Sequence, residues 1–301
     1  MEFETIMKEL PVSSKKTAAV AAAEDEYVLQ TACRAYESGI VQPILCGRKS
    51  EIKSLADRCR LDISRFEIID ARDGKQAAQE AVSLVKQEKA DMLMKGLIQT
   101  SDLLRVILDK EKGLRTGKVL SHVSIINSPI LNRVLLITDA AVIPYPDLSL
   151  KTEMIRNAVA AANGLGIRCP KVAPLAAVEV VNPDMPATVD AALLTVMNHR
   201  GQIADCIVDG PLSLDLAISP EAAVHKKVSS DVAGKADILL FHNIEAANST
   251  VKTFTIAGNC LFGGVVMGAS APVILTSRSD SAQSKLYSIA CAALISKSVS
   301  V

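Results

Sequence analysis

The chain has 301 residues, of which 49% are hydrophobic, and its 33 lysines and arginines balance its 33 aspartates and glutamates. This length provides enough core for two domains, and a net charge of zero without a basic block argues against a nucleic-acid or membrane-surface partner. Only 3% of the residues are aromatic and none is tryptophan, which argues against a base-stacking platform.

Neither a membrane span nor an export signal is predicted. Charges interrupt the alanine-rich runs too often for a bilayer span, and the stretch MEFETIMKELPVSSKK lacks an apolar signal core. We therefore expect a cytoplasmic protein. The seven cysteines form no C-x-x-C pair and the four histidines show no ligand spacing, so we expect buried free thiols and no protein-held metal.

Strand-like apolar runs alternate with amphipathic helical stretches in the first third of the chain. The expected elements are strand 16–23, a helix from 24–26 to Gly39, strand 40–46, helix 51–60, strand 66–69, helix 76–89, strand 91–94 and a helix from residue 100 or 101. Two apolar runs then follow, Val119–Ile126 and Val134–Thr138, with only a polar break containing Pro129 between them. We expect these two strands to pair in antiparallel fashion and to offer a dimer surface.

The segment 139–149 contains two prolines and predicts a domain boundary. Alternation then resumes with helix 150–163, strand 171–176, helix 186–198, strand 204–208, helix 219–227, strand 236–241, helix 245–257 and strand 263–267. A short strand at 271–276 and a helix from Ser281 end the chain. Strands separated by helices predict parallel pairing in a doubly wound α/β sheet.

Polar residues at the carboxyl ends of these strands are the candidate site residues, because ligands of such sheets bind beyond those ends. They are Lys95-Gly96, Asp139, Asp209-Gly210-Pro211, His242-Asn243 with Glu245 and Asn248, and Thr276-Ser277-Arg278. Each residue alone is as readily a turn or cap residue. Together they offer cations and hydroxyls for an anion, and carboxylates that could handle a proton.

The stretch Thr276-Ser277-Arg278-Ser279-Asp280 joins the last strand to the last helix. Free N–H groups and the positive end of the helix dipole favour an anion there, and the Arg278 guanidinium suits phosphate or carboxylate. In the alternative interpretation, Ser279 or Asp280 merely caps the helix and Arg278 pairs with a neighbouring acid.

Several familiar motifs are missing from the sequence. There is no G-x-x-x-x-G-K-[ST] phosphate loop, no G-x-G-x-x-G after the first strand, and no G-x-S-x-G nucleophile elbow. A P-loop enzyme, a nicotinamide-dependent enzyme with the usual fingerprint and an ordinary serine hydrolase are therefore disfavoured.

Six runs across nearly the whole chain resemble the phosphate acetyl/butyryltransferase family. They are ADMLMKGLIQTSDLLRVIL (90–108), GLRTGKVLSHVSII (113–126), KVAPLAAVEVVNP (171–183), CIVDGPLSLDLA (206–217), VAGKADILLFHNIEAAN (232–248) and APVILTSRSDS (271–281). The order VDGPL, VAGKAD, TSR is specific, and the match is nearer to the butyryl branch than to the acetyl branch.

The resemblance implies a two-domain α/β/α sandwich like that of isocitrate and isopropylmalate dehydrogenases, with the site in the interdomain cleft. Residues 1–145 and 271–301 would form the first domain, and residues 146–270 the second. The implied reaction is reversible transfer of a butyryl or branched short-chain acyl group between coenzyme A and inorganic phosphate. Coenzyme A is then a substrate, with no permanently bound cofactor, and a homodimer or higher homo-oligomer is expected.

Ser277 and Arg278 match the family's Ser-Arg pair, in which the serine lies near the thiol or carbonyl and the arginine binds phosphate. In the acetyl enzymes a catalytic aspartate follows that serine by seven positions, where this chain has Ser284. Asp280 and then Asp209 are the alternative acids, unless positive charge alone keeps the thiol ionised.

Anion-binding positions complete the expected site. Arg105 lies where the family often has an anion-binding arginine, and Arg115 in the run GLRTG is the alternative position for that arginine. Lys95, Thr276, Asn243, Glu245 and Asn248 are the further expected contacts to phosphate or coenzyme A.

Other functions remain open at this point. Within the same fold these are a phosphate acetyltransferase, an acyl-carrier-protein:phosphate acyltransferase and a decarboxylating dehydrogenase, although the metal-binding aspartates of the last are not found. The non-enzymatic alternative is a coenzyme A-binding sensor, which would bind without turnover.

Overall fold

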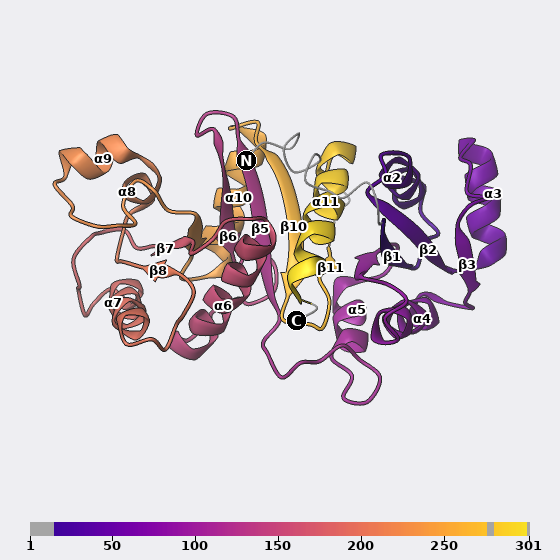
Figure 1. The fold of residues 1–301 in the computed structure, drawn as a ribbon, viewed down its shortest axis with the longest axis horizontal. Coiled ribbons are helices and arrows are strands. Elements are labelled where there is room, and N and C mark those ends of the chain that lie inside the picture. The colour runs from indigo at the N-terminus through magenta and orange to yellow at the C-terminus, as the bar shows by residue number, and fades with distance from the viewer. Residues whose placement is uncertain (1–14, 276–279, 300–301) are drawn as a thin grey trace. The chain divides into compact units, whose positions relative to one another are not determined.

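The computed structural model describes residues 15–275 and 280–299, and its contacts divide the chain into two compact units. We call residues 15–118, 263–275 and 280–299 the terminal unit, and residues 119–262 the central unit. Figure 1 labels their helices and strands.

The terminal unit contains a mixed sheet in the order β3-β2-β1-β4-β11-β10. Its strands are β1 (Lys16–Ala21), β2 (Val41–Gly47), β3 (Glu67–Asp70), β4 (Met92–Lys95), β10 (Leu261–Met267, whose first two residues belong to the central unit) and β11 (Val273–Ile274). Its helices are α2 (Glu26–Glu37), α3 (Lys49–Cys59), α4 (Gly74–Lys86), α5 (Thr100–Ile107) and α11 (Ala282–Val299). The pairs β3–β2, β2–β1, β1–β4 and β4–β11 are all parallel.

Local sequence explains where these helices begin. Asp25 and Asp73 are the N-caps of α2 and α4, and their carboxylates accept the N–H groups of Val28 and Gln76. The interior of β1 is built of small buried residues, which lets α4 pack closely on it. Helix α11 packs against α2, and its residues 287–296 are buried on every side, as expected of a helix that is apolar all round.

The central unit contains strands in the order β5-β6-β9-β7-β8. They are β5 (Ser121–Ser128), β6 (Arg133–Thr138), β7 (Lys171–Pro174), β8 (Ile207–Val208) and β9 (Ile238–Leu240). Its helices are α6 (Leu148–Gly164), α7 (Pro186–His199), α8 (Leu214–Ile218), α9 (Pro220–His225) and α10 (Ile244–Ile256). Strands β5 and β6 are antiparallel as predicted, and the pairs β6–β9, β9–β7 and β7–β8 are parallel.

A doubly wound α/β architecture is therefore present, with three differences from the sequence-based expectation. Strand β10 pairs with β11 in antiparallel fashion, because only a short turn and no helix joins them. A short helix, α8, precedes α9 where no helix was expected. The outer edge of β6 pairs with β9 within the chain, so that edge is not open for a dimer contact.

The division into units also differs from the predicted domain limits of 145/146 and 270/271. The units divide after Lys118 and after Phe262. The β5–β6 pair accounts for most of the difference, because β6 pairs with β9 and so lies with the central strands. The C-terminal segment returns to the terminal unit, where β11 pairs with β4.

Cysteine burial follows the prediction in part. Five of the seven free thiols are buried, whereas Cys59 is half-buried and Cys169 is exposed. Both exceptions lie at element ends, Cys59 as the last residue of α3 and Cys169 in the loop before β7. Among the helices that the structure describes, none combines the length and apolar character needed to cross a membrane.

Candidate functional site

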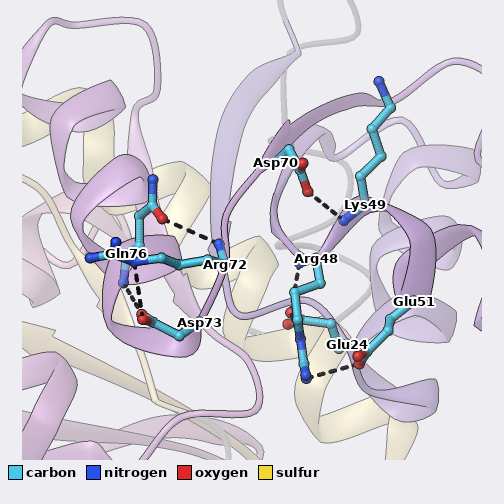
Figure 2. Close-up of polar contacts among 8 residues, drawn as sticks. All are labelled: Glu24, Arg48, Lys49, Glu51, Asp70, Arg72, Asp73 and Gln76. Carbon is cyan, nitrogen blue, oxygen red and sulfur yellow. Dashed lines mark hydrogen bonds and ion pairs between the residues drawn. The ribbon is translucent and has the colours of Figure 1, made fainter.

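The carboxyl ends of β1, β2 and β3 carry a network of charged side chains in the terminal unit (Figure 2). The Glu24 carboxylate, which follows β1, accepts the backbone N–H of Arg48 at 2.7 Å and its Nε–H at 3.2 Å. Arg48 also pairs with Glu51 of α3 at 2.8 Å. Because Glu24 is only 6% exposed, these contacts neutralise a buried carboxylate and fix the loop after β2 to the loop after β1.

The loop after β3 is held in the same way (Figure 2). The Asp70 carboxylate accepts the backbone N–H of Lys49 at 2.9 Å, and Gln76 accepts the N–H of Arg72 at 3.2 Å. The N–H of Gln76 in turn keeps the pKa of the Asp73 carboxyl below its ordinary value. These side chains fix the loops at the carboxyl ends of β1, β2 and β3, and none of them was among the predicted site residues.

The end of β1 and the loop after β4 meet closely. The strand order changes direction here, because β2 and β3 lie on one side of β1 and β4 lies on the other. Gly96 donates its N–H to the Ala21 carbonyl at 2.8 Å, and Leu97 donates to the Ala22 carbonyl at 2.7 Å. A Cβ atom at Gly96 would lie 2.1 Å from the oxygen of Ala22, so this approach requires glycine. The position between β1 and β4 is the switch point at which open α/β sheets bind ligands.

Beside this switch point the terminal unit has a cavity of about 730 Å³ between α4 and α5. Its wall includes the first residues of α4 and the N-cap of α5, with an apolar portion from Val82, Leu97, Ile98 and Val106. The volume lies in the usual range for small-molecule sites.

Cations outnumber carboxylates on the cavity wall. Four cationic side chains line it, from Lys75, Lys86, Arg105 and Lys112, against the two carboxylates of Asp102 and Asp109. With the helix N-termini, this composition favours a ligand that carries several negative charges. The adjoining apolar wall favours a ligand that also has an apolar portion.

The carboxylates of the cavity are both engaged. Asp102 pairs with Arg105 at 2.8 Å, but both side chains are at least half exposed, so an anion could displace the carboxylate at little cost. Asp109 accepts the N–H groups of Glu111 and Lys112, and these bonds hold the pKa of its carboxyl below the ordinary value.

Of the predicted anion-binding residues, Arg105 lines this cavity and Arg115 does not. Arg115 is exposed, and its backbone forms an antiparallel bridge with Ala269. Lys95 ends β4, directly ahead of the cavity loop Leu97–Gln99, and its Nζ lies 3.3 Å from the Gly96 carbonyl oxygen.

Thr276, Ser277 and Arg278 lie outside the described residues. Asp280 is half-buried immediately ahead of α11. The Oγ atom of Ser281, which directly precedes α11, accepts the N–H of Ser284 at 3.1 Å, as an N-cap side chain does.

In the central unit, the predicted strand-end residues have structural bonds. Asn243 caps α10 by accepting the N–H of Ala246 at 2.9 Å, and Asn248 donates to the Ala140 carbonyl at 3.0 Å. Glu245 accepts the hydroxyl of Tyr145. Asp209 is half-buried after β8. Glu245 and Asn248 thus fix α10 to the loop after β6, whereas Asn243 caps α10 itself. All three had been predicted to contact substrate.

A second polar cluster lies at the carboxyl end of β9 in the central unit. The Lys151 ammonium of α6 is 2% exposed, and it contacts Asp190 of α7 at 2.5 Å and the Nδ1 atom of His242 at 2.8 Å. His242 was among the predicted strand-end residues, whereas Lys151 and Asp190 were not predicted, because both lie on helices without a motif. Within the described ranges, 15–275 and 280–299, no three His, Cys, Asp or Glu side chains are grouped to hold a metal ion.

Known proteins resemble this chain over almost its full length. The model of the family described as Phosphate acetyl/butaryl transferase matches residues 2–83 and 73–293. Phosphate butyryltransferase of Clostridium beijerinckii is 52% identical over 293 residues, covering 97% of each chain. Phosphate acetyltransferase of Thermotoga maritima is 43% identical over 279 residues, covering 93% of this chain and 95% of the relative.

Solved structures agree with this likeness. A branched-chain phosphotransacylase from Enterococcus faecalis V583 superposes with a TM-score of 0.84 at 36% identity, covering 93% of this chain and 99% of the other. A 4-hydroxythreonine-4-phosphate dehydrogenase from Klebsiella pneumoniae reaches a TM-score of 0.59 at 12% identity, covering 94% of this chain and 100% of the other. The second likeness concerns the fold alone.

Proposed function

This chain belongs to the phosphate acetyl/butyryltransferase family and is a phosphate acyltransferase, and from that premise we propose that it prefers a butyryl or branched short-chain acyl group. The observation that carries the proposal is the 52% identity to a phosphate butyryltransferase over 97% of both chains. The 36% sequence identity to a branched-chain phosphotransacylase of known structure supports the same class of acyl group.

In the proposed reaction, an oxygen of inorganic phosphate attacks the thioester carbonyl of acyl-coenzyme A. The carbon–sulfur bond breaks, coenzyme A leaves as thiolate, and the acyl group remains on phosphate as acyl phosphate. The reaction therefore needs an anion site, stabilisation of the developing oxyanion and a means of keeping the thiol ionised. Both substrates enter from solution, and we expect no permanently bound cofactor.

We assign the phosphate contact to Arg278 and the contact to the thiol or carbonyl to Ser277, by their match to the family's Ser-Arg pair. Asp280 is the first choice for the proton-handling acid and Asp209 the second. Asp280 is favoured because it is the carboxylate nearest to the Ser-Arg pair in the sequence.

The cavity between α4 and α5 is the proposed site for the phosphate-bearing part of coenzyme A. Four cations, two helix N-termini and an apolar wall match a ligand that combines phosphates with a flat base. Arg105 is the proposed anchor because its guanidinium can bind a phosphate in a bidentate manner. Lys95 ends β4 ahead of the cavity loop Leu97–Gln99. Asn243, Glu245 and Asn248 instead cap α10 or hold it to the loop after β6.

The test is phosphate-dependent release of free thiol from butyryl-coenzyme A by wild type and by Arg278→Ala. We expect release that requires phosphate and falls by at least about 100-fold in the variant, because the lost contact carries charge. The same assay with acetyl-coenzyme A examines the chain-length preference.

Other outcomes contradict the proposal in distinct ways. A clear preference for acetyl-coenzyme A would make the chain a phosphate acetyltransferase, as the relative in Thermotoga maritima is named. Release without phosphate would indicate a thioesterase, and turnover only with acyl-carrier protein would indicate that alternative acyl donor. Binding of coenzyme A without any turnover would indicate a sensor.

Self-association belongs to the same proposal. We expect a homodimer or a higher homo-oligomer, and light scattering after gel filtration would measure its mass. A monomer at assay concentration would contradict this expectation.

A further inference from the structure

The cluster of Lys151, Asp190 and His242 joins three elements of the central unit. Lys151 lies in the second turn of α6, Asp190 in the second turn of α7, and His242 follows β9 immediately before the N-cap of α10. Strand β9 is flanked by β6 and β7 with parallel pairing on both sides. His242 therefore occupies the carboxyl end of an interior parallel strand, where sheets of this class bind their ligands.

The contact with Lys151 determines which nitrogen of His242 carries the proton. A lysine ammonium has only donors, so the Nδ1 atom at 2.8 Å must accept, and the proton of the neutral ring is then on Nε2. The His242 side chain is 38% exposed, whereas the Lys151 side chain is only 2% exposed. A ligand in solvent can therefore reach the histidine but not the lysine.

The charges that face His242 keep its ring neutral. Burial and the Lys151 ammonium lower the pKa of His242, and the Asp190 carboxylate, 3.8 Å from Nδ1, opposes them without reversing the shift. The other residues that line this cluster are apolar, and they include Pro174 at the end of β7, Leu175 after it and Leu194 of α7. An uncharged ring that carries its proton on Nε2 is a hydrogen bond donor at that nitrogen and cannot act as a base there.

We propose that His242 is a hydrogen bond donor to a substrate oxygen in the acyl transfer, and that Lys151 and Asp190 position it. This inference rests on the proposed function and adds a residue to it. A neutral imidazole that donates to an oxygen gaining negative charge is a known catalytic device. That oxygen is the thioester carbonyl oxygen, because the attacking phosphate oxygen loses negative charge as the new bond forms.

The first experiment observes the imidazole itself in protein labelled with [15N]histidine. The chain has four histidines, and the His242 signals are identified by their loss in His242→Gln. We expect titration below the ordinary histidine value of about 6.5, and a shift of the Nε2–H signal on addition of substrate. Inorganic phosphate alone and butyryl-coenzyme A alone are added separately, and the shift is expected with butyryl-coenzyme A. An unchanged signal with butyryl-coenzyme A would overturn the proposal.

The second experiment measures the effects of substitutions on kcat and on KM separately. For His242→Ala we expect kcat to fall by about 100-fold with KM changed by less than about threefold, since loss of one such donor weakens the transition state. His242→Gln retains an N–H donor and is expected to recover part of kcat. The control is His225→Gln, an exposed histidine at the end of α9, with unchanged kcat.

A positioning role of Lys151 predicts a change in the titration of His242. In Lys151→Met the cation that lowers the pKa of His242 is absent and Asp190 remains, so the titration of the [15N]histidine signals of His242 should move to higher pH. If wild type turns over and His242→Ala keeps full kcat, this inference fails while the proposed function stands. If wild type releases no thiol, the proposed function fails first, and the titration of His242 still tests the cluster.

Discussion

At the scale of single residues, polar side chains near the strand ends divide into two groups. Glu24, Asp70 and Asn243 are occupied by bonds to backbone N–H groups and hold loops or helix ends. Arg105 and His242 have partners on one side only and remain partly exposed to solvent. We expect ligand contacts from the second group, because Arg105 gives up only an exposed ion pair to bind and His242 keeps its bond at Nδ1.

Arg105→Ala is predicted to raise KM for butyryl-coenzyme A by about tenfold with little effect on kcat. The reason is that a charged contact to a bound phosphate is worth about 1.5 kcal/mol or more, and it is present in ground state and transition state alike. Steady-state kinetics measure the effect. Arg34→Ala, at an exposed site of α2, is the matched control, and equal KM values for the two variants would remove Arg105 from the site.

At the scale of elements, the cavity depends on how β1 and β4 end. Two backbone bonds join the residues after β4 to the end of β1, and the chain continues through the cavity loop Leu97–Gln99 into α5. The position of α5, and with it of Arg105, is thus set by a contact between two backbone segments.

Gly96→Ala is predicted to lower the free energy of unfolding by about 2 kcal/mol or more. The added Cβ would lie 2.1 Å from the Ala22 oxygen and 2.6 Å from the Ala21 oxygen, so the backbone must separate. Urea denaturation measures the change. Gly74→Ala is the matched control, because its Cβ would come no nearer than 3.8 Å to Ala22, and an equal loss in both variants would contradict the steric explanation.

At the scale of the whole molecule, buried thiols make stability depend on alkaline pH. Burial, reinforced by Glu80 and Glu67, raises the pKa of the Cys46 thiol to about 12, and burial raises those of Cys33 and Cys206 to about 11. The unfolded thiols ionise near pH 8.5. Their contribution to stability is therefore complete below that pH and is lost as the pH rises toward 11–12.

For Cys46 alone, the free energy of unfolding should fall by roughly 1.4 kcal/mol per pH unit above pH 8.5. Urea denaturation at pH 8, 9 and 10 would measure the slope. Cys46→Ala should reduce the total slope by about that amount and leave the part due to Cys33 and Cys206, although a cavity lowers its stability at every pH. Cys169→Ala should leave the slope unchanged, because that thiol is exposed. A wild-type stability independent of pH across this range would contradict the prediction.

The sequence by itself determined the alternation of strands and helices and the family. Apolar periodicity marked β1, β2 and β6 because each strand is buried in a sheet flanked by helices, and specific runs such as VDGPL identified the family and its acyl transfer. The tertiary structure alone decided which polar residues lie together. Lys151, Asp190 and His242 are far apart in sequence, and Lys75, Lys86 and Lys112 look like ordinary solvated lysines until α4 and α5 enclose a cavity. The physical reason is that periodicity reports burial of apolar faces, which is local, whereas the meeting of charges depends on which strands pair and which helices pack together.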